Sequence, residues 1–155
     1  MYDTGMLIAL ADRKAKAVAL HSGLRVTPHR ALILGPVLAQ VWRPRSAVIH
    51  ALAGVLKDCT VPGARASEPS MRAARAGQPE CMACAIGPDL TDWRRVGAAL
   101  GEARLPAKKR PDAVDAWVAL SAVKHGSAVI FTSDPEDIEA YLGVLNPRDV
   151  HVERV

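Results

Sequence analysis

Short apolar runs alternate with amphipathic segments along this chain, and this alternation constrains the fold more than any other feature. The clearest apolar run is Ala128–Thr132 (AVIFT), and a shorter one, ALIL, spans Ala31–Leu34. A turn and then a helical pattern follow each run, which is the order of βα units around a parallel sheet. The alternation therefore predicts an α/β fold with a mostly parallel central sheet and helices on both faces.

The same pattern gives the expected order of elements. Strands are expected at Met1–Asp3, Ala31–Leu34, Cys59–Val61, Ala128–Thr132 and Val150–Val152. Helices are expected over Gly5–Ala11, Lys14–Val26, Val37–Trp42, Ser46–Leu56, Trp93–Arg104, Asp112–His125 and Pro135–Leu145. Several ends follow from caps and breakers, such as Pro44 and Gly126 at helix ends and Asp112 at a helix start.

Residues 62–88 differ in composition from the rest of the chain. They are mostly Ala, Gly, Pro, Arg and Ser, which bury little surface, so we expect a flexible insertion in a single domain spanning residues 1–155. Cys81 and Cys84 within it have the CxxC spacing of half a zinc site. Zinc, a redox disulfide and inert thiols in a mobile loop all remain open, because no second paired motif exists.

Composition sets broad limits on the class of protein. No apolar run reaches the length of about 18 residues that a membrane span needs, and Gly5–Ala11 lacks the flanks of a signal peptide. We therefore expect a cytoplasmic protein with no membrane partner. The net charge of +4 suits contact with phosphates. A solvated basic surface explains the same excess.

Two acids fall where strands are predicted to end. Asp3 ends the first strand, and Asp134 follows Thr132 and Ser133 at the end of the AVIFT run. Ligands of open α/β sheets bind outside the carboxyl ends of the strands, so neighbouring strands would bring both acids to one rim. The alternatives are a helix cap for Asp134 and an ordinary loop acid for Asp3.

Asp115 is a sharper observation, because its helical neighbours are small and apolar. Three, four and seven residues further on stand Val118, Ala119 and Ala122, a face suited to packing on a sheet. An unpaired carboxylate on such a face is unfavourable, and a metal ion or another cation removes the penalty. A partly exposed first-turn acid is the alternative, and Asp112 is better explained as the helix cap.

Four pieces of the sequence, in this order, resemble PIN-domain ribonucleases. They are YDTGMLIAL, GPVLAQVWR, DAVDAWVALSAVKHG and AVIFTSDPED. The resemblance covers residues 1–61 and 93–155, and it points to the VapC-type toxins of bacterial toxin–antitoxin pairs, in their actinobacterial branch. It implies a PIN-like three-layer sandwich and metal-dependent cleavage of RNA with Mg²⁺ or Mn²⁺. It also implies an antitoxin protein as partner and a homodimer, and the choice of RNA over DNA rests on it alone.

The resemblance also assigns site residues. The first, third and fourth acids of the motif fall on Asp3, Asp115 and Asp134, and Asp137 follows closely as a further metal ligand. The second acid is normally Glu, and Gln40 stands in its place. An amide has no charge, so this departure predicts weaker metal affinity, or one tightly bound ion instead of two.

Substrate contacts are expected from polar and basic residues near these acids. They are Thr4, Arg43, Lys108, Lys109, Arg110 and Ser133. The basic run 108–110 leads into the helix that carries Asp115, so it is placed to contact the RNA backbone. A solvated loop is the alternative for each charge run.

Two other functions compete with a nuclease. The first is a PIN-like module with weak or no catalysis that binds RNA or a protein partner. It is favoured by Gln40, which stands where the family motif has Glu, and by the insertion at 62–88. The second is a phosphoacceptor receiver domain, which also gathers aspartates at strand ends. It ranks below the others, because Asp3 stands alone on its strand and no Lys follows the C-terminal strand.

Overall fold

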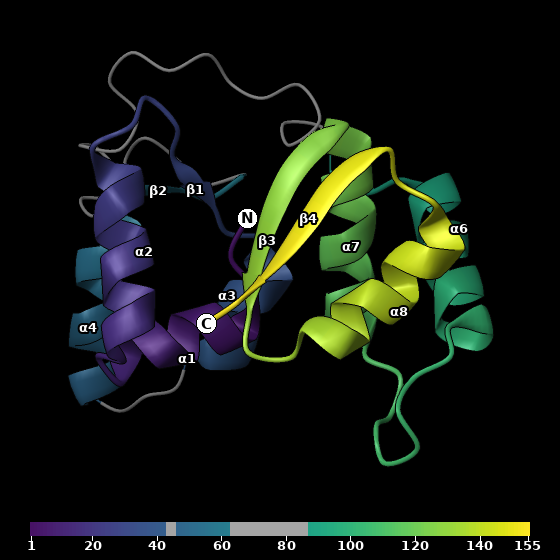
Figure 1. Ribbon diagram of the computed structural model, residues 1–155, viewed down its shortest axis with the longest axis horizontal. Coiled ribbons are helices and arrows are strands. Elements are labelled where there is room, and N and C mark those ends of the chain that lie inside the picture. The colour runs from purple at the N-terminus through teal and green to yellow at the C-terminus, as the bar shows by residue number, and fades with distance from the viewer. Residues whose placement is uncertain (43–45, 63–86) are drawn as a thin grey trace.

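The computed structural model describes residues 1–42, 46–62 and 87–155. These form a mixed α/β fold with short parallel strands (Figure 1). Strand β1 (Ala31–Leu32) pairs with β2 (Cys59–Thr60), and β3 (Ser127–Thr132) pairs with β4 (Asp149–Arg154). The seven described helices are α1 (Thr4–Ala11), α2 (Ala15–Arg25), α3 (Gly35–Val41), α4 (Ser46–Leu56), α6 (Leu90–Glu102), α7 (Ala113–His125) and α8 (Pro135–Leu145).

The backbone around Tyr2 links the two small sheets. Tyr2 forms parallel bridges to Ile33 on one side and to Phe131 of β3 on the other. Its N–H donates to the Leu32 carbonyl at 2.8 Å, and the Asp3 N–H donates to the Phe131 carbonyl at 3.1 Å. Across the molecule the order is therefore β2, β1, the Tyr2 segment, β3 and β4, all parallel.

The expected continuous central sheet is only partly present. The described part of the chain forms two two-stranded sheets, and the predicted first strand is a single bridged residue. The reason is local: α1 begins at Thr4 and α3 begins at Gly35, so the chain leaves the extended conformation almost at once. A PIN-like three-layer sandwich is therefore not clear from the strands alone.

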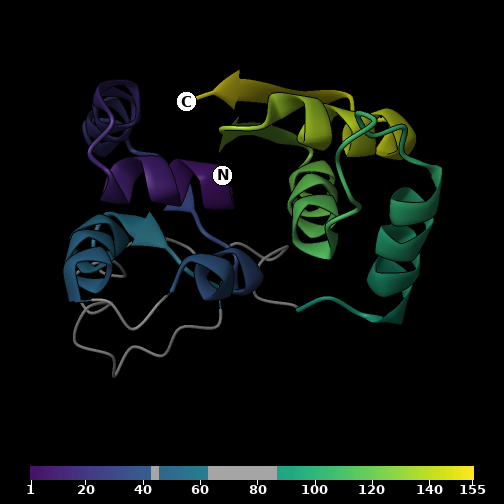
Figure 2. The same ribbon diagram turned by 90° about the horizontal axis from the view of Figure 1, so that it is seen from below.

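Helices pack on both ends of this arrangement. Helices α1 and α7 both contact β3, α8 contacts β4, and α6 packs on α7. Helices α1, α2 and α4 lie at one end of the molecule, and α6, α7 and α8 lie at the other (Figure 2). Gly5 of α1 lies against Ser133, which directly follows β3, and α8 begins at Pro135. The carboxyl end of β3 therefore lies between the start of α1 and the start of α8.

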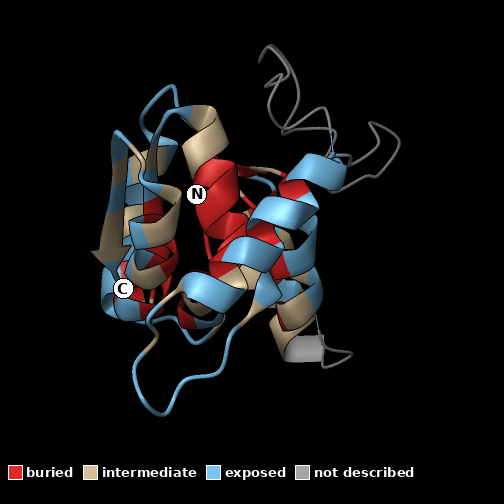
Figure 3. Ribbon diagram, turned by 90° about the vertical axis from the view of Figure 1, so that its right-hand side faces the viewer, coloured by how far each residue is buried: buried red, intermediate tan, exposed pale blue. Residues whose placement is uncertain are grey.

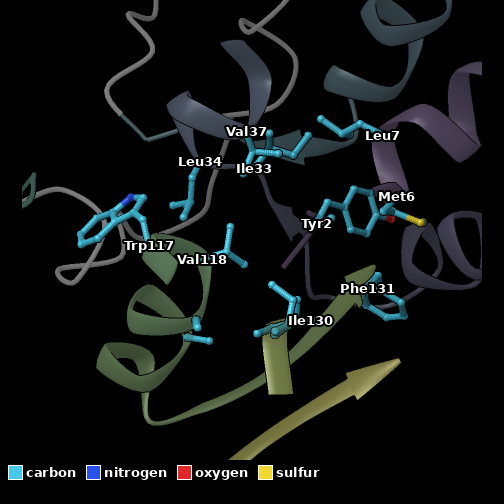
Figure 4. Packing of buried hydrophobic residues seen from close by; sticks show 14 of the residues in the cluster. Tyr2, Met6, Leu7, Ile33, Leu34, Val37, Trp117, Val118, Ile130 and Phe131 are labelled. Atoms are coloured by element: carbon cyan, nitrogen blue, oxygen red, sulfur yellow. The ribbon is translucent and has the colours of Figure 1, made fainter. Parts of the chain in front are cut away.

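The core is built from small and branched apolar side chains. Val118 of α7 and Ile130 of β3 converge with Leu34 in the interior (Figure 4). Helix α7 is buried along 116–122, which explains its unusually apolar sequence. Burial of each such Val, Leu or Ile side chain contributes about 1.5–3 kcal/mol, and the exposed faces lie on the outer helices (Figure 3).

Most helix ends lie within two residues of the sequence prediction, and the start of α6 differs most. Helix α6 begins at Leu90 instead of Trp93, because Asp89 and Asp92 form a reciprocal capping box. Gly126, with φ of 85°, ends α7 as expected. Strand β4 is longer than predicted, since it pairs with β3 along its whole length.

Some predictions fall outside the described residues. These are most of the predicted insertion at 62–88, the CxxC pair Cys81 and Cys84, and the basic residue Arg43. Among the helices that the structure describes, none is both long and apolar enough to cross a membrane.

Gly5 generates a test of how α1 packs on the turn after β3. A Cβ at Gly5 would lie 2.2 Å from Ser133 Oγ and 2.7 Å from the Ser133 backbone nitrogen. Gly5→Ala is therefore expected to lower the free energy of unfolding by about 1–3 kcal/mol, measured by urea denaturation. The control is Gly97→Ala in α6, where a Cβ meets nothing within 4 Å and a gain of about 0.5–1 kcal/mol is expected. A Gly5→Ala protein as stable as wild type would contradict this packing.

Candidate active site

Asp3 lies at the point where the two sheets are joined. It follows the bridged Tyr2 and precedes α1, so its backbone position is fixed from both sides. The carboxyl is 5% exposed; Oδ2 accepts a hydrogen bond from Thr132 Oγ1 at 2.8 Å, while Oδ1 is buried without a partner. Burial raises the pKa of Asp3 above its usual value, and the Thr132 hydrogen bond opposes this effect.

The end of β3 brings a second acid to the same edge. Thr132 is fully buried, and its hydroxyl bonds to Asp3 while accepting the backbone N–H of Asp134 at 3.0 Å. One hydroxyl therefore ties the first strand end to the turn after β3. The Asp134 side chain makes no capping hydrogen bond to α8, although it occupies the N-cap position, so the cap alternative does not account for its carboxylate.

Asp115 enters this region from the first turn of α7. The pKa of its half-buried carboxyl is raised to about 7, first by burial and then by nearby negative charges. Those charges, in order of effect, belong to Asp3, Asp112, Asp137 and Asp134. Acids predicted from three distant parts of the sequence therefore share one electrostatic environment, which we call the acid cluster: Asp3, Asp115, Asp134 and Asp137.

Lys109 is paired with two members of the acid cluster. Its Nζ lies 3.0 Å from Asp134 Oδ1 and 2.9 Å from Asp137 Oδ2. These bonds, that to Asp137 first, hold the pKa of Lys109 above its usual value. Asp137 is 8% exposed, and its Oδ1 is buried without a hydrogen-bond partner. The sequence assigned Lys109 to substrate binding, whereas the structure turns its ammonium toward the acids.

Gln40 contacts the neighbours of the acid cluster through both ends of its amide. Oε1 accepts a hydrogen bond from Thr4 Oγ1 at 2.5 Å, and Nε2 donates to Asp112 Oδ2 at 3.1 Å. Asp112 also caps α7 by accepting the Val114 N–H at 2.7 Å, and its own N–H donates to Tyr141. Gln40 thus joins α3 to the starts of α1 and α7, and its carbonyl oxygen is already engaged by Thr4.

The other predicted substrate contacts are distributed around this edge. Ser133 is half-buried; its hydroxyl donates to Asp134 at 3.4 Å, and its carbonyl accepts from Arg154. Lys108 and Arg110 are exposed on the loop between α6 and α7. Both basic side chains are therefore accessible to a polyanion.

The acid cluster has the donor chemistry for Mg²⁺ or Mn²⁺, because it offers only carboxylate oxygens. The unpartnered buried oxygens of Asp3 and Asp137 support this fit, since a buried polar atom without a partner is unfavourable unless a cation or donor reaches it. Within residues 1–42, 46–62 and 87–155, however, no three acids, histidines or cysteines are arranged as a metal-binding group. The residue types fit the ion, and in this arrangement two of them are engaged by Lys109.

Two residues that contact the predicted site residues, Thr132 and Asp112, were not predicted as part of the site from the sequence. Thr132 was assigned only to a strand, although a hydroxyl at the end of an apolar run and two residues before an acid is a usable signal. Asp112 was assigned only as a cap, yet it also accepts from Gln40 and raises the pKa of Asp115. Comparison with protein-family models, curated proteins and solved structures found no match to this chain.

The raised pKa of Asp115 predicts a stability change with pH in metal-free protein. Between about pH 4 and pH 7 the folded protein retains a proton that the unfolded chain has released. The free energy of unfolding therefore falls as pH rises through this range. Asp115→Asn removes the ionisable group and is expected to stabilise the protein at pH 8, in the presence of a chelator, by at most about 4 kcal/mol.

Urea unfolding from pH 4 to pH 8 measures this effect. The control is Asp12→Asn, which removes the same charge from an exposed position and is expected to change stability by less than about 0.5 kcal/mol. A lower stability of Asp115→Asn than of wild type at pH 8 would show that the carboxylate has a stabilising partner.

Proposed function

We propose that this chain is a metal-dependent endoribonuclease of the PIN type, acting as the toxin of a toxin–antitoxin pair. The observation that carries the proposal is the acid cluster, in which carboxylates from two other segments of the chain, Asp3 and the pair Asp134 and Asp137, contribute to the raised pKa of Asp115. Two buried oxygens without partners add to it. Strongly perturbed acids gathered at strand ends are typical of functional sites, because folding alone disfavours them.

The fold is compatible with this proposal. The parallel order β2, β1, Tyr2 segment, β3 and β4 places Asp3 centrally and Asp134 on the adjacent strand end. A PIN-like sandwich, with helices on both faces of an interrupted sheet, accounts for that order. The family, RNA as substrate, the antitoxin protein and the homodimer are expectations from the sequence resemblance, and the cytoplasm is an expectation from composition.

The roles of the chain's own residues follow from their contacts. Asp3, Asp115, Asp134 and Asp137 would hold Mg²⁺ or Mn²⁺. Such an ion activates water and stabilises negative charge on phosphoryl oxygens. Thr132 orients the Asp3 carboxylate through its hydrogen bond. Lys108 and Arg110 bind the backbone phosphates. No side-chain nucleophile is needed, because the ion would supply an activated water.

The second candidate is a PIN-like module with weak or no turnover that binds RNA or a protein partner. A specific observation favours it: Gln40 carries no charge and uses both ends of its amide within the protein. Only three of the four acids of the family motif are then present, and Lys109 already pairs with two members of the acid cluster.

Cleavage of labelled total RNA in a Mn²⁺ or Mg²⁺ titration separates the two candidates. Wild type is expected to cleave RNA only with added metal. Asp3→Asn and Asp115→Asn are expected to reduce the rate by about 100-fold or more, because each removes charge from the ion's first shell. Asp12→Asn, with the same charge change at an exposed site, is expected to cleave like wild type.

Wild type without activity in either ion would end the nuclease proposal. Filter binding of the same RNA would then decide between the RNA-binding module and a module that binds protein.

A further inference from the structure

The loop between α6 and α7 is attached to the start of α8 by one side chain. This loop, residues 103–112, projects from the same end of the molecule as the N-terminus of α8 (Figure 1). Lys109 Nζ reaches from it to both Asp134 and Asp137. A turn closed by the Lys109 N–H and the Pro106 carbonyl, at 2.8 Å, presents the ammonium. Its neighbours Lys108 and Arg110 remain exposed.

The pairing divides the acid cluster into two parts. Asp134 and Asp137 are paired with a cation, whereas no ion pair is seen for Asp3 among the described residues: its Oδ2 accepts from the Thr132 hydroxyl, and its Oδ1 is buried without a hydrogen-bond partner. The second oxygen of Asp137 is also buried and unpartnered. With Lys109 in place, two carboxylate oxygens of the acid cluster therefore still have no hydrogen-bond partner: Oδ1 of Asp3 and Oδ1 of Asp137.

We propose that Lys109 is a tethered counter-ion of the acid cluster, which a divalent cation displaces from Asp134 and Asp137 when it binds. The inference rests on the proposed function for the use of the cluster as a cation site, and not on turnover. An ammonium and a divalent ion repel each other when both lie against the same pair of carboxylates, so the two compete for Asp134 and Asp137. Lys109 therefore lowers the affinity for the metal and holds the loop against α8 while metal is absent.

Displacement has a consequence for the loop. Once released, Lys109 joins Lys108 and Arg110 as a third free cation, and a nucleic acid backbone can take it up. A polyanion that binds Lys109 favours metal binding, and metal binding favours the polyanion, because coupling between two sites is reciprocal. Through Lys109, binding of the metal ion to the acid cluster thereby depends on the presence of substrate phosphate.

The test compares Lys109→Met with Arg104→Met, which removes the same charge from an exposed position on the same loop. Mn²⁺ affinity is measured without RNA, at fixed ionic strength, by the electron paramagnetic resonance signal of free Mn²⁺. Lys109→Met is expected to bind Mn²⁺ about tenfold more tightly than wild type, and Arg104→Met to bind it within about twofold of wild type. Lys109→Arg keeps the charge and is expected to stay close to wild type.

A second readout follows the loop in wild-type protein and does not depend on a variant that folds. Hydrogen–deuterium exchange of residues 105–111 is expected to increase when Mn²⁺ saturates the cluster, because the tether to α8 is lost. Unchanged exchange at saturating Mn²⁺, or wild-type Mn²⁺ affinity in a folded Lys109→Met protein, overturns the inference. Failure of every form to bind Mn²⁺ overturns it together with the metal site. Tighter binding by Lys109→Met without any RNA cleavage supports the inference and refutes only the nuclease.

Discussion

The site depends on the backbone pairing of one residue, Tyr2. Its main chain bridges to Ile33 and to Phe131, so it joins two sheets of only two strands each. Its side chain is fully buried, meets the Phe131 ring edge to face at 5.8 Å, and bonds to His21 at 2.9 Å. With Tyr2 held on both sides, Asp3 can only lie beside the end of β3, where Thr132 meets it.

Without a bound metal ion, gathering the carboxylates of the acid cluster at one place lowers the stability of the fold. Burial and like charges together raise the pKa of Asp115 to about 7, and burial alone is the largest effect on Asp3. This loss of stability is the pattern expected of a functional site. Lys109 offsets part of the repulsion at Asp134 and Asp137. In this account the bound ion offsets the rest.

Features set by local sequence were predictable. Helix α7 and strand β3 follow from their apolar patterns and from Asp112 and Gly126 at the helix ends. The proximity of Asp3 and Asp134 follows from the rule that ligands bind at the carboxyl ends of strands. Asp115 was predicted differently, from the small apolar face of its helix and from the family resemblance. The sequence could not give the length of β1, because the start of a helix competes with the extended strand at the same residues.

Contacts between distant side chains were not predictable. A basic run shows that cations are present, but not that Lys109 is the one that pairs with Asp134 and Asp137. Likewise, Gln40 was expected beside a metal, and its amide instead connects Thr4 to Asp112. These pairings depend on side-chain positions that only the assembled fold defines. They also change the chemical interpretation, since they show which groups a metal ion must compete with.

The most direct test of this account is a crystal structure of the wild-type protein with Mn²⁺, located by anomalous scattering. The account predicts one peak coordinated by Asp3 and Asp115 together with Asp134 or Asp137, with Lys109 Nζ moved away from both acids that it contacts here. A structure at saturating Mn²⁺ with no peak among these carboxylates, and with Lys109 still between Asp134 and Asp137, would contradict it.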